Sequence, residues 1–95
     1  MSTLEQRLFE GDQARLVLEN EAFTAAFEAT EREVIEQWTN SPARDIEGRE
    51  RLWMMLALLR NVKSSLRTTL ETGMLAAKEL EHRRSIAERV KQWAR

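Results

Sequence analysis

The chain has 95 residues, of which one third are charged, and its positive and negative charges nearly cancel to a net −1. It contains no cysteine and one histidine, which excludes disulfides, thiolate zinc sites and cysteine nucleophiles and leaves little for histidine-based chemistry. A chain of this length supports one small domain whose monomeric core is usually marginal, so we expect it to oligomerise.

Residues 1–11 predict a short N-terminal turn. This segment contains Leu4 and Leu8 and ends at Gly11, a residue type that often closes a helix. It has neither a basic start nor an apolar run, so it does not resemble a signal peptide. Asp12 follows and offers a side-chain acceptor for the free N–H groups of a helix that begins there.

Residues 12–39 predict the first long helix, because apolar residues recur at helical spacing with charged residues between them. These apolar residues are Leu16, Phe23, Ala26, Phe27, Val34, Ile35 and Trp38. Residues 40–45 predict a turn, since Pro42 disfavours helix at the residue before it. Either Ser41 or Asp45 can cap the helix that follows.

Residues 46–81 predict a second helix with a regular apolar seam. Seam residues are spaced alternately four and three apart, a heptad pattern typical of coiled-coil packing. They are Leu52, Leu56, Leu59, Lys63, Leu66, Leu70, Gly73, Ala77 and Leu80. The apolar stripe is wider than one partner helix covers, because the seam is flanked by Trp53, Met55, Leu58, Val62 and Met74. The apolar run from Leu52 to Leu59 is too short to span a membrane. We expect the helix to continue through Gly73, because helix-forming residues resume directly after it.

Residues 82–95 predict a basic amphipathic extension. When the two helices fold back on each other at the turn, the first helix ends before the second one does. In that register the expected neighbours are Phe27 with Ala57, Phe23 with Asn61, Leu16 with Thr68, and Leu8 with Ala76. The extension then has no partner in its own chain, although Ile86, Val90 and Trp93 form an apolar stripe on it. Such a stripe indicates contact with another chain.

Charge is divided unevenly between the two halves. Residues 1–47 hold eleven acidic and four basic residues, and residues 48–95 hold five acidic and eleven basic ones. The favoured interpretation is an acidic helix paired with a basic one. The alternative is that the basic half binds an anion, and nucleic acid or a nucleotide stays open as a partner, whereas a three-residue stripe is too short to favour a membrane surface. The candidate contacts with a partner protein or an anion are Arg60, Lys63, Arg67, Arg83, Arg84, Arg89, Lys91 and Trp93.

Lys63 is the one charged residue on the seam. A buried ammonium group requires a partner, and the expected register places Glu21 opposite it, in a pair that would fix the alignment of the helices. The alternative is that copies of Arg60, Lys63 and Arg67 converge in an oligomer to hold a phosphate-bearing ligand. Both hypotheses remain open at the level of sequence.

Glu79 and His82 have the three-residue spacing of half a carboxylate-bridged di-iron site. They lie beside the seam and are followed by Arg83 and Arg84, so we interpret them as part of a solvated helix face. The chain also has no glycine-rich phosphate loop and no nucleophile with an orienting base. The sequence therefore predicts no metal site, no cofactor and no enzymatic activity.

Three runs occur in order along the chain: ENEAF at 19–23, WTNSPARD at 38–45, and a stretch at 48–77 that starts GRERLWMMLALL and ends LETGMLAA. With these runs the sequence resembles small uncharacterised α-helical proteins of tailed bacteriophages and prophages. The resemblance implies a virion or packaging accessory, or a small protein that acts on the host cell. It also implies a location in the host bacterial cytoplasm or the virion.

The expected fold is an all-α antiparallel hairpin with a long, heptad-bearing second helix that assembles into an oligomeric bundle. The expected function is non-enzymatic and consists of homo-oligomerisation and contact with another phage or host protein. The alternative is a binder of anionic ligands, either DNA during packaging or a nucleotide signal sequestered from host defence. The expected oligomer seam consists of Leu52, Leu56, Leu59, Lys63, Leu66, Leu70, Ala77 and Leu80.

Overall fold

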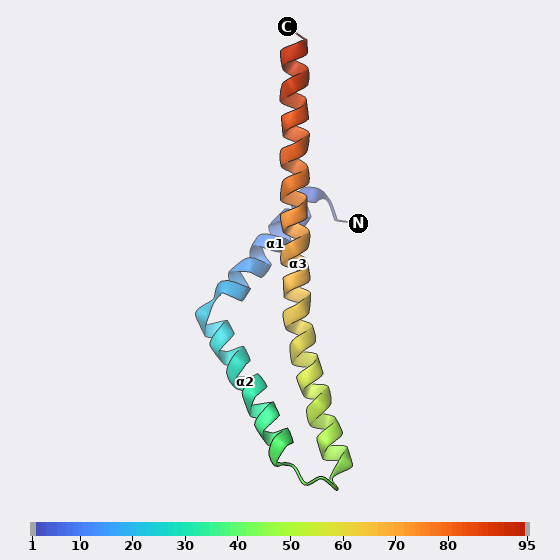
Figure 1. The fold of residues 1–95 in the computed structure, drawn as a ribbon. Helices are drawn as coiled ribbons and strands as arrows, with labels where there is room; N and C mark the ends of the chain where they lie inside the picture. The colour runs from blue at the N-terminus through green and yellow to red at the C-terminus, as the bar shows by residue number, and fades with distance from the viewer. Residues whose placement is uncertain (1, 95) are drawn as a thin grey trace.

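A computed structural model describes residues 2–94, which form three helices joined by short connections (Figure 1). Helix α1 spans Leu4–Glu19, α2 spans Glu21–Asn40 and α3 spans Ile46–Trp93. The described part has no strand, so the all-α prediction is confirmed, as is the long helix in the second half. The molecule measures 78 × 25 × 16 Å, and its radius of gyration of 21.2 Å far exceeds the ~12 Å of a compact chain of this length.

Helix α1 begins at Leu4, so the prediction of a turn over residues 1–11 and a helix start at Asp12 is wrong. The Thr3 hydroxyl accepts a hydrogen bond from the Gln6 backbone N–H at 3.1 Å, and the Gln6 side chain accepts one from the Thr3 N–H at 2.8 Å. This reciprocal capping box starts the helix early. Gly11 consequently lies inside α1 and ends nothing.

The predicted first helix over 12–39 is interrupted at Asn20. This residue has extended backbone angles (φ −70°, ψ 120°), and its side-chain oxygen accepts a hydrogen bond from the Phe23 N–H at 2.9 Å. The Thr24 hydroxyl donates to the Leu18 carbonyl at 3.2 Å across the break. A helix-capping side chain thus separates α1 from α2, and the elbow they form stands away from α3 (Figure 1).

The connection between α2 and α3 lies where the turn was predicted. Of the two predicted caps, Asp45 is the one used, because its carboxylate accepts a hydrogen bond from the Gly48 N–H at 3.1 Å. The Arg49 guanidinium donates to the hydroxyl and carbonyl oxygens of Ser41 and lies 4.4 Å from the centroid of the Trp38 ring. These contacts tie the end of α2 to the start of α3 where the chain reverses direction (Figure 1).

Helices α1 and α3 cross with two glycines in contact. A Cβ atom added to Gly11 would lie 2.7 Å from the Cα atom of Gly73, and one added to Gly73 would lie 2.7 Å from the Cα atom of Gly11. Ala14 and Ala76 are buried beside the crossing. Small residues allow two helix backbones to approach this closely. Helix α3 continues through Gly73, as predicted.

The boundary predicted between residues 81 and 82 is not a helix boundary, because α3 runs unbroken to Trp93. Beyond the start of α1, however, α3 projects alone (Figure 1), and every residue from 82 to 94 is exposed. We call this segment the C-terminal overhang. The core beside the rest of α3 is small. Its buried apolar side chains are Ala14, Phe27, Val34 and Ala76.

Candidate interaction surfaces

The predicted seam residues are half-buried on α3. Leu52 and Leu56 lie beside Val34 of α2, and Leu70 and Ala77 lie beside α1 at the glycine crossing. The residues of the predicted oligomer seam all have this intermediate exposure; they are Leu52, Leu56, Leu59, Lys63, Leu66, Leu70, Ala77 and Leu80. The seam is therefore partly used within the chain, and its pairing with a second chain stays a prediction.

Two grooves flank the line along which α2 meets α3. We call the first the tryptophan groove; it is lined by Val34, Ile35, Trp38, Leu52, Trp53, Leu56 and Arg60. We call the second the apolar groove; it is lined by Thr30, Val34, Met55, Leu58, Leu59 and Val62. Arg60 adds a cation to the tryptophan groove, and none of the described residues that line the apolar groove is charged.

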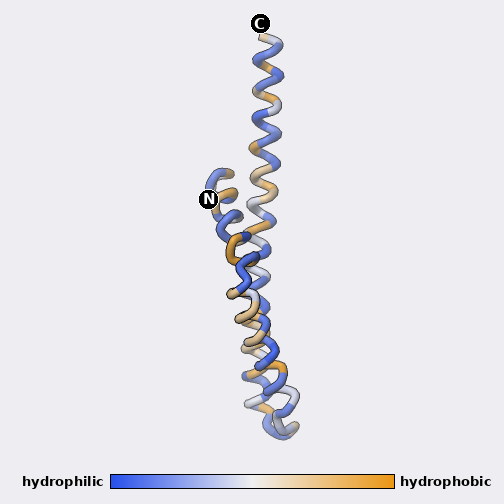
Figure 2. Tube along the Cα trace, turned by 90° about the vertical axis from the view of Figure 1, so that its left-hand side faces the viewer, coloured by the Kyte–Doolittle hydropathy of each residue, from blue (hydrophilic) through white to orange (hydrophobic). Residues whose placement is uncertain are grey.

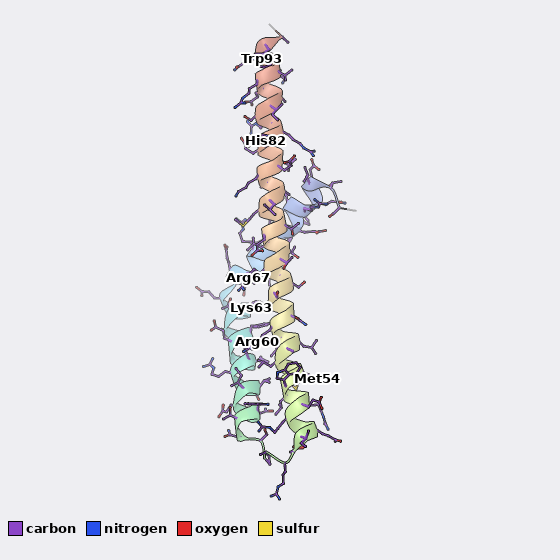
Figure 3. All side chains as sticks on the ribbon, turned by 45° about the vertical axis from the view of Figure 1, so that its right-hand side comes forward. Met54, Arg60, Lys63, Arg67, His82 and Trp93 are labelled. Carbon is purple, nitrogen blue, oxygen red and sulfur yellow. The ribbon has the colours of Figure 1, made fainter. Side chains whose placement is uncertain are left out.

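Large apolar side chains are exposed along the whole molecule. Figure 2 shows hydrophobic residues on all three helices, alternating with hydrophilic ones in the overhang. Met54 lies on the edge of α3 away from α2 (Figure 3), and Trp93 near the end of the overhang is 87% exposed. Much of the apolar surface that an ordinary domain buries is left open in this chain.

Lys63 lies in a cleft beneath the elbow of α1 and α2. Its ammonium nitrogen is 5.7 Å from the centroid of the Phe27 ring, which packs against Phe23 with 5.7 Å between ring centroids. We call this space of about 280 Å³ the elbow cleft; it is lined by Leu18, Phe23, Thr24, Phe27, Lys63, Arg67 and Leu70. A half-buried ammonium is thus placed over an aromatic face.

The expected pair between Lys63 and Glu21 is wrong: Glu21 is exposed, and no ion pair joins the two in residues 2–94. The predicted proximity of Phe27 to Ala57 is replaced by its contact with Lys63. Sixteen residues separate Gly11 from Phe27, whereas ten separate Gly73 from Lys63. The six additional residues, about 9 Å of helix, make the detour through the elbow and shift the register of α2 along α3.

The three cations proposed to converge on a ligand have different neighbours in the monomer. Figure 3 places Arg60, Lys63 and Arg67 along the part of α3 that faces the elbow and α2. Arg60 pairs with Glu31 of α2 at 3.0 Å, so its charge is already matched. Arg67 is exposed and lines the elbow cleft with Lys63. Two of the three cations therefore share one site.

The overhang presents its basic residues to solvent. Arg83 pairs with Glu79 at 3.2 Å, and Arg84 pairs with Glu88 at 3.5 Å. Within residues 2–94, Arg89 and Lys91 make no ion pair. All of these groups are exposed, so the pairs within the overhang add little stability and leave it with an excess of positive charge.

Glu79 lies near Arg83 and not in a metal cluster. In the part of the chain that the structure describes, no three His, Cys, Asp or Glu side chains gather closely enough to hold a metal ion. None of the helices formed by residues 4–93 is long and apolar enough to cross a bilayer.

No protein family, curated protein or solved structure among those compared with the chain matches it. The resemblance to phage proteins thus rests on the three sequence runs at 19–23, 38–45 and 48–77.

Sequence reasoning missed the two features that shape the molecule. The capping box was visible as a threonine followed three residues later by a glutamine, at Thr3 and Gln6. The cap at Asn20 was visible as an asparagine followed by Glu21 in the first turn of a helix. The first signal competes with Gly11 and Asp12, which favour a helix start at residue 12, and the second competes with an apolar spacing that continues across Asn20.

Proposed function

We propose that the protein is a non-enzymatic accessory of phage type, a helical hairpin that assembles with copies of itself and contacts another phage or host protein. This proposal rests on the large solvent-accessible surface area of the chain. The chain exposes 7967 Å². A compact monomer of its mass of 11.1 kDa exposes about 5,700 Å². The excess of about 2,300 Å² per chain is larger than the ~800 Å² that each partner buries in a standard interface.

The exposed apolar side chains support the same conclusion. Many of them line the two grooves beside α2 or lie on the overhang, where burial by another chain removes them from water. At about 25 cal/mol per Å² of apolar surface, burial of even part of the excess stabilises an assembly by many kcal/mol before the entropic cost of association. The groove not used between copies offers a contact site for a different protein.

Sedimentation velocity tests the first step. We expect an assembly of two or more chains at micromolar concentration, because the monomer leaves its apolar grooves open. Circular dichroism on the same samples checks that the helices are formed. A folded, fully helical monomer at these concentrations contradicts the proposal.

A second candidate function rests on the elbow cleft. Lys63 and Arg67 supply positive charge beside the rings of Phe23 and Phe27, which are tilted by 35° to each other, and this combination suits an anionic ligand with an aromatic base. The volume of about 280 Å³ lies at the small end of ligand pockets and fits one base better than two. The function that this cleft would serve is sequestration of a nucleotide signal. For DNA, the corresponding site is the exposed basic overhang.

Binding of nucleotides and of DNA, each measured at several salt concentrations, distinguishes the elbow cleft from the overhang as the binding site. A nucleotide held in the elbow cleft is expected to lose at least tenfold in affinity when Lys63 and Arg67 both become glutamine, because two phosphate contacts are removed. The matched variant, with Arg83 and Arg84 changed to glutamine, is expected to retain nucleotide affinity and to weaken DNA binding. Absence of binding to the intact protein, measured with labelled nucleotides and a short DNA duplex, discards this candidate.

A further inference from the structure

Helix α3 carries a second heptad stripe beside the seam. Each of its residues directly precedes one seam position or the continuation of that pattern into the overhang, and the spacing alternates between three and four throughout. We call this set the second stripe; it consists of Met55, Leu58, Val62, Ser65, Thr69, Thr72, Ala76, Glu79, Arg83, Ile86, Val90 and Trp93.

The second stripe is apolar at both ends and small or polar in the middle. Its first three residues lie in or beside the apolar groove, and its last three lie on the overhang. The six end residues are 46–87% exposed; they are Met55, Leu58, Val62, Ile86, Val90 and Trp93. Two separate patches of the same character thus occur on one continuous helix.

When two copies of the stripe are aligned antiparallel, the apolar end of each copy lies against the other apolar end of its partner. A second α3 running antiparallel, with the two-fold axis at the level of Met74, sets Ile86 against Val62, Val90 against Leu58 and Trp93 against Met55 of the other copy. The central pairs are Ser65 with Arg83, Thr69 with Glu79, and Thr72 with Ala76. Every pair occurs twice, as a two-fold symmetric interface requires.

We propose that a second copy of this chain docks antiparallel along the second stripe, so that the overhang of each copy fills the apolar groove of the other. This inference rests on the proposed assembly and names its interface. The apolar groove is the better of the two grooves for the overhang, because Met55, Leu58 and Val62 of the second stripe line it, whereas the described lining of the tryptophan groove includes no residue of that stripe.

Charge favours the antiparallel orientation. The overhang has four basic residues and the single acid Glu88, whereas α2, which forms one wall of the apolar groove, has five glutamates and the single base Arg32. An antiparallel pair brings opposite charges together at both ends. A parallel pair would instead align the two basic overhangs with each other and the two acidic α2 helices with each other.

At the middle of the second stripe, α1 already covers part of the surface of α3. Ala76 is buried and Thr69 is half-buried on the side where α1 crosses, whereas Ser65 and Thr72 are exposed. The second α3 therefore packs beside α1, against the exposed half of the stripe. The small side chains at these positions allow both helices to approach α3.

Cysteine cross-linking tests the register, and the chain is suited to it because it has no cysteine of its own. Chains with Leu58→Cys are mixed with chains with Val90→Cys and oxidised mildly. We expect a disulfide-linked dimer from the mixture and almost none from either variant alone. In the proposed dimer, copies of the same position are 32 residues apart along α3, or about 48 Å.

Cross-linking of the Val90→Cys variant with itself indicates parallel overhangs and overturns the proposal. An assembly seen by sedimentation without the mixed cross-link overturns this interface while leaving the proposed assembly intact, whereas a folded monomer overturns both.

A matched pair of tryptophan variants adds a measurement of affinity. Trp93→Ala is expected to raise the dimer dissociation constant by roughly tenfold or more, because a buried interface tryptophan is removed. Trp53→Ala removes an exposed tryptophan from the tryptophan groove and is expected to change the constant by less than about threefold. Equal effects of the two substitutions contradict the assignment of the overhang to the apolar groove.

Discussion

Replacing Gly73 with leucine is expected to detach α1 from α3. Any Cβ at this position lies 2.7 Å from the Cα atom of Gly11 and 3.0 Å from the carbonyl oxygen of Arg7, so it overlaps backbone, which cannot rotate aside as a side chain can. Overpacking in a core typically costs ~1–3 kcal/mol, and leucine adds three more carbon atoms at the crossing. We therefore expect a loss near or above the upper end of that range, measured as a lower midpoint of chemical unfolding.

The alanine variant makes the test sharper. Alanine is favoured over glycine in a helix interior by about 1 kcal/mol. Gly73→Ala therefore stabilises the chain if the crossing has space for a Cβ atom, and destabilises it if the two backbones are in contact as described. We expect destabilisation. Gly48→Ala is the control, because the nearest atoms to a Cβ there belong to the Asp45 carboxylate, a side-chain group that can rotate while one of its oxygens still accepts from the N–H of residue 48. A more stable Gly73→Ala variant contradicts the crossing.

Replacing Phe27 with alanine is expected to release α2 from the middle of α3. Phe27 is the largest buried side chain, at 9% exposure, and its ring contacts Phe23 and lies beneath the Lys63 ammonium. Its removal loses apolar burial, the ring pair and the contact that stabilises a half-buried charge. We expect a cost of about 3 kcal/mol, at the low end for buried phenylalanine because the elbow cleft is already partly open.

Phe9→Ala is the matched control for this prediction. Phe9 is in α1 and is 63% exposed, outside both the core and the second stripe. The same atoms are deleted in both variants, so a difference between them reports the environment of the ring. We expect the Phe9 variant to lie within about 0.5 kcal/mol of the parent chain. Equal losses in the two variants contradict the position of Phe27 in the core.

The composition and period of the sequence account for much of the fold. Few glycines and prolines and a steady apolar spacing of three and four predict long helices, and Pro42 with Asp45 predicts the connection between them. The half-buried seam from Leu52 to Leu80 also follows from the heptad period, because side chains at this spacing share one face of the helix. These features depend on interactions between residues close in sequence.

The partner of Lys63 did not follow from the sequence. Its identity depends on the register of α2 along α3, and that register depends on the length of the detour at Asn20. The elbow at Asn20 therefore gives Lys63 the neighbour Phe27 in place of Glu21. The elbow cleft, with its two cations and two rings, exists because of the same detour.

Sequence by itself thus determined that the chain is helical, where it reverses and which face of α3 is apolar. The tertiary structure alone decided the roles of Gly11 and Gly73. A glycine tolerates both the end of a helix and a close approach of another backbone, and local sequence does not distinguish these uses. What distinguishes them is the contact between Gly11 and Gly73, which are 62 positions apart in the sequence. When α1 crosses α3, each glycine occupies the space that a Cβ atom of the other would fill.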